Sequence, residues 1–151
     1  MKTANDILKE KEGSIVCVGP DETVQEALRT MVDHNIGSVF VKEEDVFVGI
    51  YTERDLLQDT VKEGFDPKAA RLRDRMTSNL LFAQHDTPLH KLQDLILGKR
   101  IRHMLIMKEG EALGVLSAGD VMKAQMNEMS KDLKSVSWDY YENWCWKGKK
   151  K

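Results

Sequence analysis

Hydrophobic and polar positions follow one another along the chain in an order that predicts short strands and amphipathic helices. A short apolar run at residues 14–18 predicts a strand, and apolar positions spaced by three and four predict a helix over residues 23–34. Two β-rich segments, residues 38–41 and 46–51, flank a polar turn and are typical of a hairpin. A second helix is expected from Thr52 onwards. The first part of the chain is therefore predicted to be β-α-β-β-α.

The rest of the chain repeats this pattern. Residues 23–31 align with residues 87–95, and residues 36–55 align with residues 101–120. The second half is expected to contain a strand at residues 80–83, a helix from Thr87 with Pro88 at its first position, a hairpin of residues 104–107 and 112–116, and a helix from Ser117.

This internal repeat divides the chain into three parts. We place the first repeat at residues 1–66, the second at residues 67–131, and a C-terminal tail at residues 132–151. Short segments with a similar pattern, residues 5–8 and 73–76, precede the two halves and are expected to bridge them.

Composition and charge exclude several classes of protein. The 151 residues include 23 Lys plus Arg against 25 Asp plus Glu, so the net charge is −2, whereas a general nucleic-acid-binding protein carries a clear basic excess. No apolar run approaches the roughly 20 residues of a membrane helix, and the first residues lack the apolar stretch of a signal peptide. We therefore expect a cytoplasmic protein without a transmembrane segment. Cys17 and Cys145 show neither zinc-site spacing nor a disulfide framework, and we expect no metal and no required cofactor.

A repeated motif carries the chemistry of the sequence. Residues 49–55 and 114–120 each run from a glycine at a strand end to a hydroxyl residue and, three positions later, an aspartate. One interpretation is a helix cap, in which the hydroxyl accepts from a backbone N–H and the carboxylate interacts favourably with the helix dipole. The other is a ligand site, because a helix N-terminus with a nearby hydroxyl and carboxylate is suited to phosphate and ribose. Two copies of the motif favour the second interpretation without excluding the first.

The arrangement of residues 23–31, 35–41 and 49–55 resembles a cystathionine-β-synthase (CBS) domain, and the second half resembles another. The resemblance implies an α/β (α+β) fold of tandem β-α-β-β-α repeats. Two small sheets are expected to pack back to back in pseudo-twofold symmetry with the helices outside, leaving two clefts. Such clefts commonly bind adenosine compounds, namely AMP, ADP, ATP, S-adenosylmethionine or NADH.

The resemblance also assigns roles to residues of this chain. It implies that Asp55 and Asp120 bind ribose hydroxyls, Thr52 and Ser117 contact ribose or phosphate, and Ile15 and Leu80 flank the base. Arg54 is suited to pairing with a phosphate, whereas Ala118 and Gly119 offer no charge at the matching place. Arg102 and His103 resemble the basic approach to the cleft in the family, the alternative being solvated surface. Binding at one site rather than two stays open.

All three tryptophans fall in the last 14 residues, where Trp138, Trp144 and Trp146 are followed by a lysine-rich end at residues 147–151. One interpretation is that the tail folds back on its own module or on the second subunit of a homodimer. The alternative is a docking peptide for an effector protein, with the lysines contacting an acidic partner or a membrane surface. A third interpretation is an expression artefact, although the tail has no recognisable tag.

Together these patterns predict a stand-alone regulatory module rather than an enzyme, since no nucleophile and base are paired in the sequence. Binding of an adenosine ligand between the repeats would signal by conformational change, in a homodimer. The competing interpretation is a ligand-free structural or protein-interaction module that acts through dimerisation and its aromatic tail.

Overall fold

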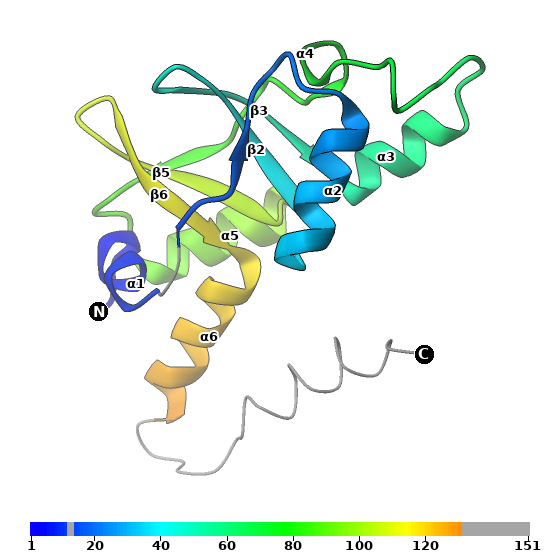
Figure 1. Cartoon of the computed structure of the whole chain (residues 1–151). Helices are drawn as coiled ribbons and strands as arrows, with labels where there is room; N and C mark the ends of the chain where they lie inside the picture. Colours follow the sequence, from blue (N-terminus) through cyan, green and yellow to red (C-terminus); the bar gives the residue numbers. More distant parts are fainter. Residues whose placement is uncertain (12–13, 131–151) are drawn as a thin grey trace.

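The structure, a computed structural model, describes residues 1–11 and 14–130 (Figure 1). The elements follow in the order α1 (Ala4–Glu10), β1 (Cys17–Val18), α2 (Val24–His34), β2 (Ser38–Glu43), β3 (Val46–Thr52), α3 (Glu53–Thr60), α4 (Leu72–Arg75), β4 (Phe82–Gln84), α5 (Leu89–Lys99), β5 (His103–Lys108), β6 (Glu111–Ser117) and α6 (Ala118–Met129).

The strands form two three-stranded sheets with the same topology, β1-β2-β3 and β4-β5-β6. In each sheet the first strand pairs in parallel with the second, which pairs antiparallel with the third. The register also repeats, because Phe40 lies opposite Ile50 in one sheet and Leu105 lies opposite Val115 in the other. The predicted tandem α+β fold is therefore confirmed.

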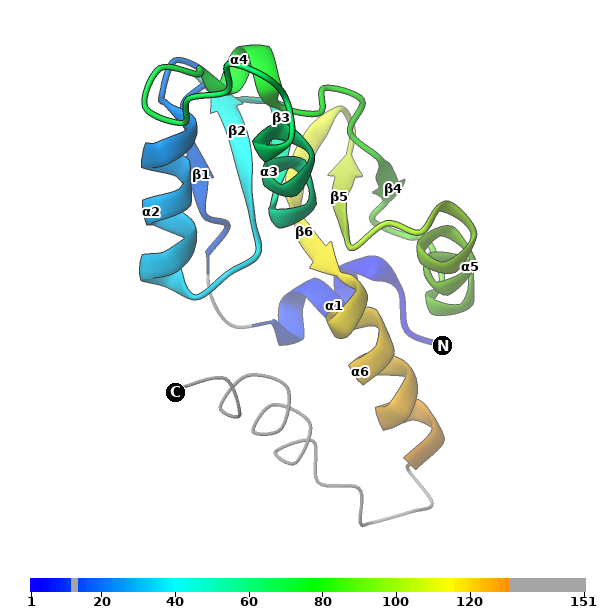
Figure 2. The same cartoon turned by 90° about the vertical axis from the view of Figure 1, so that its right-hand side faces the viewer.

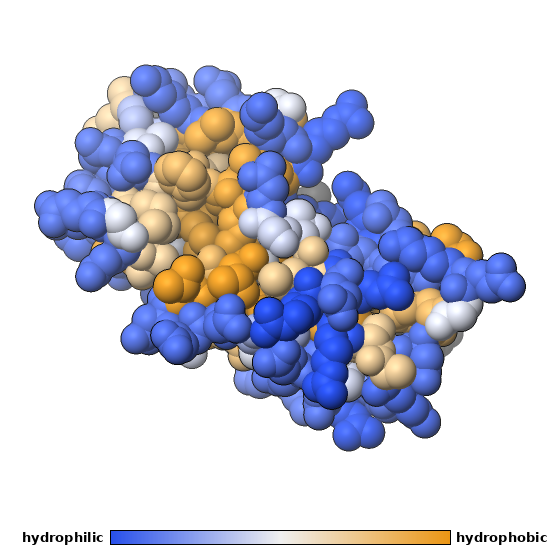
Figure 3. All heavy atoms as spheres, turned by 90° about the horizontal axis from the view of Figure 1, so that it is seen from above, coloured by the Kyte–Doolittle hydropathy of each residue, from blue (hydrophilic) through white to orange (hydrophobic). Residues whose placement is uncertain are grey.

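The inner faces of the sheets pack against each other, and the helices cover the outer faces (Figure 2). Phe40, Leu105 and Val115 form a buried cluster between the sheets, joined by partly buried Ile15 and Leu80. Two further clusters fill the space between each sheet and its helices. The arrangement agrees with two amphipathic layers that bury their apolar sides against one another. Polar side chains surround an apolar area on the face seen in Figure 3.

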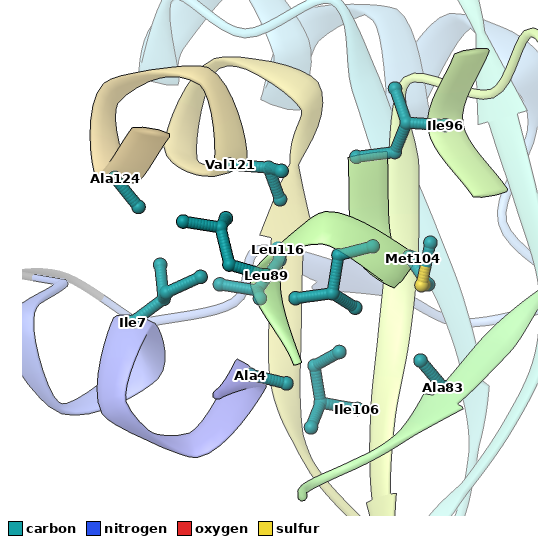
Figure 4. Packing of buried hydrophobic residues seen from close by; sticks show 11 residues of the cluster. Ala4, Ile7, Ala83, Leu89, Ile96, Met104, Ile106, Leu116, Val121 and Ala124 are labelled. Atoms are coloured by element: carbon teal, nitrogen blue, oxygen red, sulfur yellow. The ribbon is translucent and has the colours of Figure 1, made fainter. Parts of the chain in front are cut away.

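The two connecting helices cross between the repeats. Helix α1 precedes the first sheet but packs on the second, where Ala4 and Ile7 belong to the same core as Leu116 and Val121 (Figure 4). Helix α4 precedes the second sheet but packs on the first, where Leu72 is fully buried. The packing units therefore differ from the contiguous ranges 1–66 and 67–131.

The glycine of each repeated motif makes this crossing possible. A Cβ atom at Gly49 would collide with the side chain of Met76, and a Cβ at Gly114 would lie 2.9 Å from Cδ2 of Leu8. Each glycine thus provides the space in which the segment from the other half of the sequence docks onto the third strand of the sheet.

Several boundaries differ from the sequence-based expectations. Pro88 is the N-cap of α5 and not its first helical residue, because its ψ of 151° is extended. The first strand of each repeat begins later than expected, and Ile15 and Leu80 precede β1 and β4 and pack between the sheets. Within residues 1–11 and 14–130, no helix is long and apolar enough to cross a membrane. The aromatic tail lies outside the described residues.

Candidate ligand-binding clefts

Two hollows open between the repeats. The first cleft, about 1610 Å³ in volume, is lined by residues of β3, the start of α3, the approach to β4 and the loop before β5. The second cleft, about 540 Å³, is lined by the end of α1, the approach to β1, part of β2 and the middle of β6. Each cleft thus combines the approach to one sheet with the third strand of the other, as expected from pseudo-twofold symmetry.

A complete capping box forms at the start of α3 on the edge of the first cleft. Asp55 Oδ2 accepts from the backbone N–H of Thr52 and from its hydroxyl, both at 2.9 Å, and the hydroxyl accepts from the Asp55 N–H at 3.2 Å. The N–H of Glu53 donates to the Gly37 carbonyl at 3.0 Å. The capping interpretation is therefore confirmed, and these amides are already satisfied. Among the described residues nothing donates to Asp55 Oδ1, which is free to accept from a ligand.

Basic side chains line the same cleft as this carboxylate. Arg54, Arg100 and Arg102 line the first cleft, together with two acidic residues, Glu53 and Asp55. None of the three arginines forms an ion pair with residues 1–11 or 14–130. The cleft therefore combines a carboxylate oxygen with unpaired guanidinium groups, which suits a ligand that carries both hydroxyl groups and phosphate.

The equivalent capping box of the second repeat, formed by Ser117 and Asp120, contacts the second cleft through Lys11, and one oxygen of its carboxylate is already paired. Lys11 Nζ donates to Asp120 Oδ2 at 2.9 Å and to the Val115 carbonyl at 3.0 Å. The Ser117 N–H donates to the same carboxylate oxygen at 2.7 Å. Burial alone raises the pKa of Asp120, but the hydrogen bonds from Lys11 and Ser117 outweigh this effect and hold the pKa below its usual value.

His103 and Ser38, the first residues of β5 and β2, meet between the two clefts. The Ser38 hydroxyl lies 3.3 Å from His103 Nδ1, and the Phe40 ring packs edge-on against the imidazole with the centroids 6.3 Å apart. Burial lowers the pKa of His103, and the charge of Lys11 lowers it further. The imidazole is therefore neutral at pH 7 and lines both clefts.

Comparison with known proteins identifies the family. The model of the CBS domain matches residues 4–61 and 72–127, which together make up most of the chain. The chain belongs to the CBS domain family.

Several proteins with a CBS domain are similar to this chain. The CBS domain-containing protein CBSX3, mitochondrial, from Arabidopsis thaliana is 31% identical over 144 residues, which are 89% of this chain and 70% of that protein. The crystal structure of the CBS-domain containing protein ATU1752 from Agrobacterium tumefaciens is 34% identical, with a TM-score of 0.76 over 82% of this chain and 99% of the other. A segment of inosine-5'-monophosphate dehydrogenase from Methanocaldococcus jannaschii is 29% identical over 111 residues, or 72% of this chain and 21% of that enzyme. CBS domains are generally regulatory and often bind adenosine-containing ligands.

The residues selected from the sequence lie in or beside both clefts of the CBS pair. The first cleft is lined by Thr52, Arg54, Asp55, Leu80, Arg102, His103 and Ser117. Ile15 lines the second cleft, and Asp120 contacts it through Lys11. Ser117 and Asp120, which share a capping box, therefore lie toward different clefts.

Sequence reasoning did not select Lys11, Ser38 or Arg100 as site residues. The alignment of the repeats pairs Ser38 with His103 and Asn35 with Arg100, so the repeat itself contained a signal for Ser38 and Arg100. Asn35 and Arg100 both end their helices in the left-handed conformation, with φ of 54° and 52°. Lys11 has no such signal, because a lysine at a helix end is typical of solvated surface.

Proposed function

We propose that this CBS pair is a regulatory module that binds an adenine nucleotide, AMP, ADP or ATP, in the first cleft. The observation that carries the proposal is the combination of the free Asp55 Oδ1 with three arginines that have no acidic partner among the described residues. S-adenosylmethionine carries a positive charge and no phosphate, so it would leave these guanidinium groups unpaired. NADH, with a single pyrophosphate and a second nucleoside, is a weaker candidate.

The lining of the first cleft suggests how such a ligand would lie. Asp55 is suited to accept from the ribose hydroxyls, as a carboxylate does in other nucleotide sites. Ile50 and Leu80 offer apolar contact to the adenine ring. Arg54 and Arg102 lie on opposite repeats, on the start of α3 and just before β5, and would bind the phosphates.

Regulation would follow from this division of contacts between repeats. A ligand held by Asp55 on one repeat and Arg102 on the other stabilises the arrangement of the repeats in which both contacts are made. It shifts the equilibrium by its differential affinity for the two arrangements, and an attached or bound protein would respond to that shift. The related segment within a larger dehydrogenase agrees with a module that acts on a partner. A homodimer and an effector protein remain part of this proposal.

A ligand panel tests the proposal. AMP, ADP, ATP, S-adenosylmethionine and NADH are added to ligand-free protein, and the unfolding temperature and binding heat are measured. A nucleotide at 100 times its Kd is expected to add about 2.7 kcal/mol to the free energy of unfolding. Asp55→Ala is expected to remove this increase, because it deletes the acceptor for the ribose hydroxyls.

The loss of helix capping in Asp55→Ala needs a matched control. Glu26 forms the same capping box with Thr23 at the start of α2 and does not line either cleft. Glu26→Ala therefore removes the same half of a capping box that Asp55→Ala removes, and it should leave the binding heat unchanged. If no compound shifts the unfolding of wild-type protein, the capping boxes are purely structural and the ligand-free interaction module is the better interpretation.

A further inference from the structure

The carboxylates of the two capping boxes differ in one contact. Asp55 and Asp120 occupy equivalent positions of the two repeats, and each accepts from the backbone N–H of its N-cap residue. Among residues 1–11 and 14–130, a lysine binds Asp120 but not Asp55, with Lys11 Nζ 2.9 Å from Asp120 Oδ2. The same ammonium group donates to the Val115 carbonyl at 3.0 Å. A cation of the protein therefore binds one carboxylate oxygen of Asp120 and the Val115 carbonyl beside the second cleft.

Helix α1 holds Lys11 in this position. Lys11 is the C-cap residue of α1, and its N–H donates to the Leu8 carbonyl at 3.2 Å. Leu8 in turn packs over Gly114, and Ile7 is buried in the core of the second repeat. The backbone from which the lysine side chain extends is thus fixed relative to Val115 and Asp120.

The corresponding contact is absent from the first cleft, as far as the described residues extend. Met76 packs over Gly49 as Leu8 packs over Gly114, and the residue three positions after Met76 is the neutral Asn79, whereas three positions after Leu8 stands Lys11. Asn79 lines the first cleft without making a hydrogen bond to Asp55. The first cleft is also about three times larger than the second, about 1610 against 540 Å³.

We propose that Lys11 is an internal occupant of the second cleft that excludes nucleosides, so that each chain binds one nucleotide, in the first cleft. This inference rests on the proposed function of the first cleft. A ribose that enters the second cleft meets a carboxylate whose charge is already compensated by an ammonium group, and to reach Asp120 Oδ2 or the Val115 carbonyl it must replace that charged donor with an uncharged hydroxyl. Hydrogen bonds to charged groups are the stronger class, so the displacement weakens binding by about tenfold or more.

The test measures the number of AMP molecules bound per chain, by isothermal titration with AMP up to low-millimolar concentration and by native mass spectrometry. Wild-type protein is expected to bind one AMP, and Lys11→Met, which keeps the aliphatic part of the side chain, is expected to bind two. Lys11→Met combined with Asp55→Ala is expected to bind one, in the second cleft. Lys11→Met combined with Asp120→Ala should return to one, in the first cleft.

A matched control separates this effect from a general loss of positive charge. Lys9 is an exposed lysine on the same helix and lines neither cleft. Lys9→Met is therefore expected to bind one AMP, as wild-type protein does. Lys11→Gln provides a second, more polar variant should Lys11→Met unfold, and far-ultraviolet circular dichroism verifies the fold of each variant.

The outcomes distinguish this inference from the proposed function. Two AMP molecules on wild-type protein, or one on both Lys11→Met and Lys11→Gln, would overturn the role of Lys11 and leave the nucleotide site of the first cleft standing. No AMP on wild-type protein but one on Lys11→Met would support the role of Lys11 and overturn the proposed function of the first cleft. No AMP on any variant would overturn both.

Discussion

The two repeats share a backbone but fill equivalent interior positions with different chemistry. In the first repeat Tyr51 is fully buried and its hydroxyl donates to the buried Asp59 at 3.0 Å. The aligned positions of the second repeat are Leu116 and Ala124, both in an apolar core. The comparison shows that the fold accepts either a satisfied polar pair or a purely apolar contact at this point.

The Asp59 carboxylate of the polar pair also connects helices through polar contacts, unlike Leu116 and Ala124. Asp59 Oδ1 also accepts from Lys62 at 2.7 Å and lies 3.5 Å from a guanidinium nitrogen of Arg75. The carboxylate thus connects α3, whose first residues line the first cleft, to α4, which leads into the second repeat. The equivalent place in the second repeat is occupied by apolar side chains from α1. The two repeats therefore join their last helix to the bridging helix that packs on them by different chemistry, polar in the first and apolar in the second.

The largest expected effect on stability comes from a substitution in the apolar core of the second repeat. Leu116→Ala removes a fully buried side chain beside Leu89 and Val121, and it should lower the free energy of unfolding by about 2–5 kcal/mol through lost burial and a residual cavity. Urea denaturation measures the change. Leu113→Ala, at a position of the same strand that is 45% exposed, is the control and should change stability far less. Similar losses for both variants would contradict this account of the second core.

A smaller effect on stability is expected from a substitution in the buried polar pair of the first repeat. Tyr51→Phe deletes one donor to a buried carboxylate and should cost about 1–3 kcal/mol, because that carboxylate keeps Lys62 and Arg75 as partners. The measurement is a double-mutant cycle with Asp59→Ala, again by urea denaturation. In the Asp59→Ala background the effect of Tyr51→Phe should nearly vanish. An unchanged cost in that background would mean that the tyrosine acts through packing alone.

The smallest effect concerns acid stability. Burial raises the pKa of Asp120, but hydrogen bonds from Lys11 and Ser117 outweigh it, so the folded-state pKa lies below the usual 3.8. A carboxyl group whose pKa is lowered by folding contributes stability above its unfolded pKa, and that contribution is lost as the pH falls through the folded pKa. Lys11→Met should therefore reduce the loss of stability between neutral pH and the region below about 3.8. Unfolding curves at several pH values measure this slope, and a slope equal to that of wild-type protein would contradict the role of the lysine.

Local sequence signals are enough to predict the β-α-β-β-α elements of both repeats and their order, whereas α1 and α4 are expected only as bridging segments. The apolar spacing of residues 23–34, the β-rich hairpin segments and the aligned halves all act over a few residues or through the repeat, and the structure contains each of them. Pro88 was placed one position too far into the helix, because proline suits both the N-cap and the first turn. Residues 5–8 and 73–76 bridge the two halves as expected, but the sheet on which α1 packs could not be predicted, since Ala4 and Ile7 would fit either sheet equally well by pattern alone.

The candidate site was predictable only in part, for a related reason. The motif of Thr52 and Asp55 repeats in the sequence and could be found by comparing the halves. Lys11 has no repeated counterpart, and its contact with Asp120 depends on tertiary packing of α1 against β6 and α6. The difference between the two clefts therefore arises from a long-range contact that neither half of the sequence contains on its own.

The crossing of α1 also has a consequence for biosynthesis. Helix α1 leaves the ribosome before either sheet, yet Leu116 and Val121, against which Ile7 is buried, emerge only after almost all of the described chain has been made. Helix α4 can pack on the first sheet midway through synthesis. The core of the second repeat cannot form until both α1 and α6 have been made. Helix α1 is thus made before both sheets but is among the last elements to find its partners, and the side chains of Ala4 and Ile7 lack their native contacts until α6 has been made.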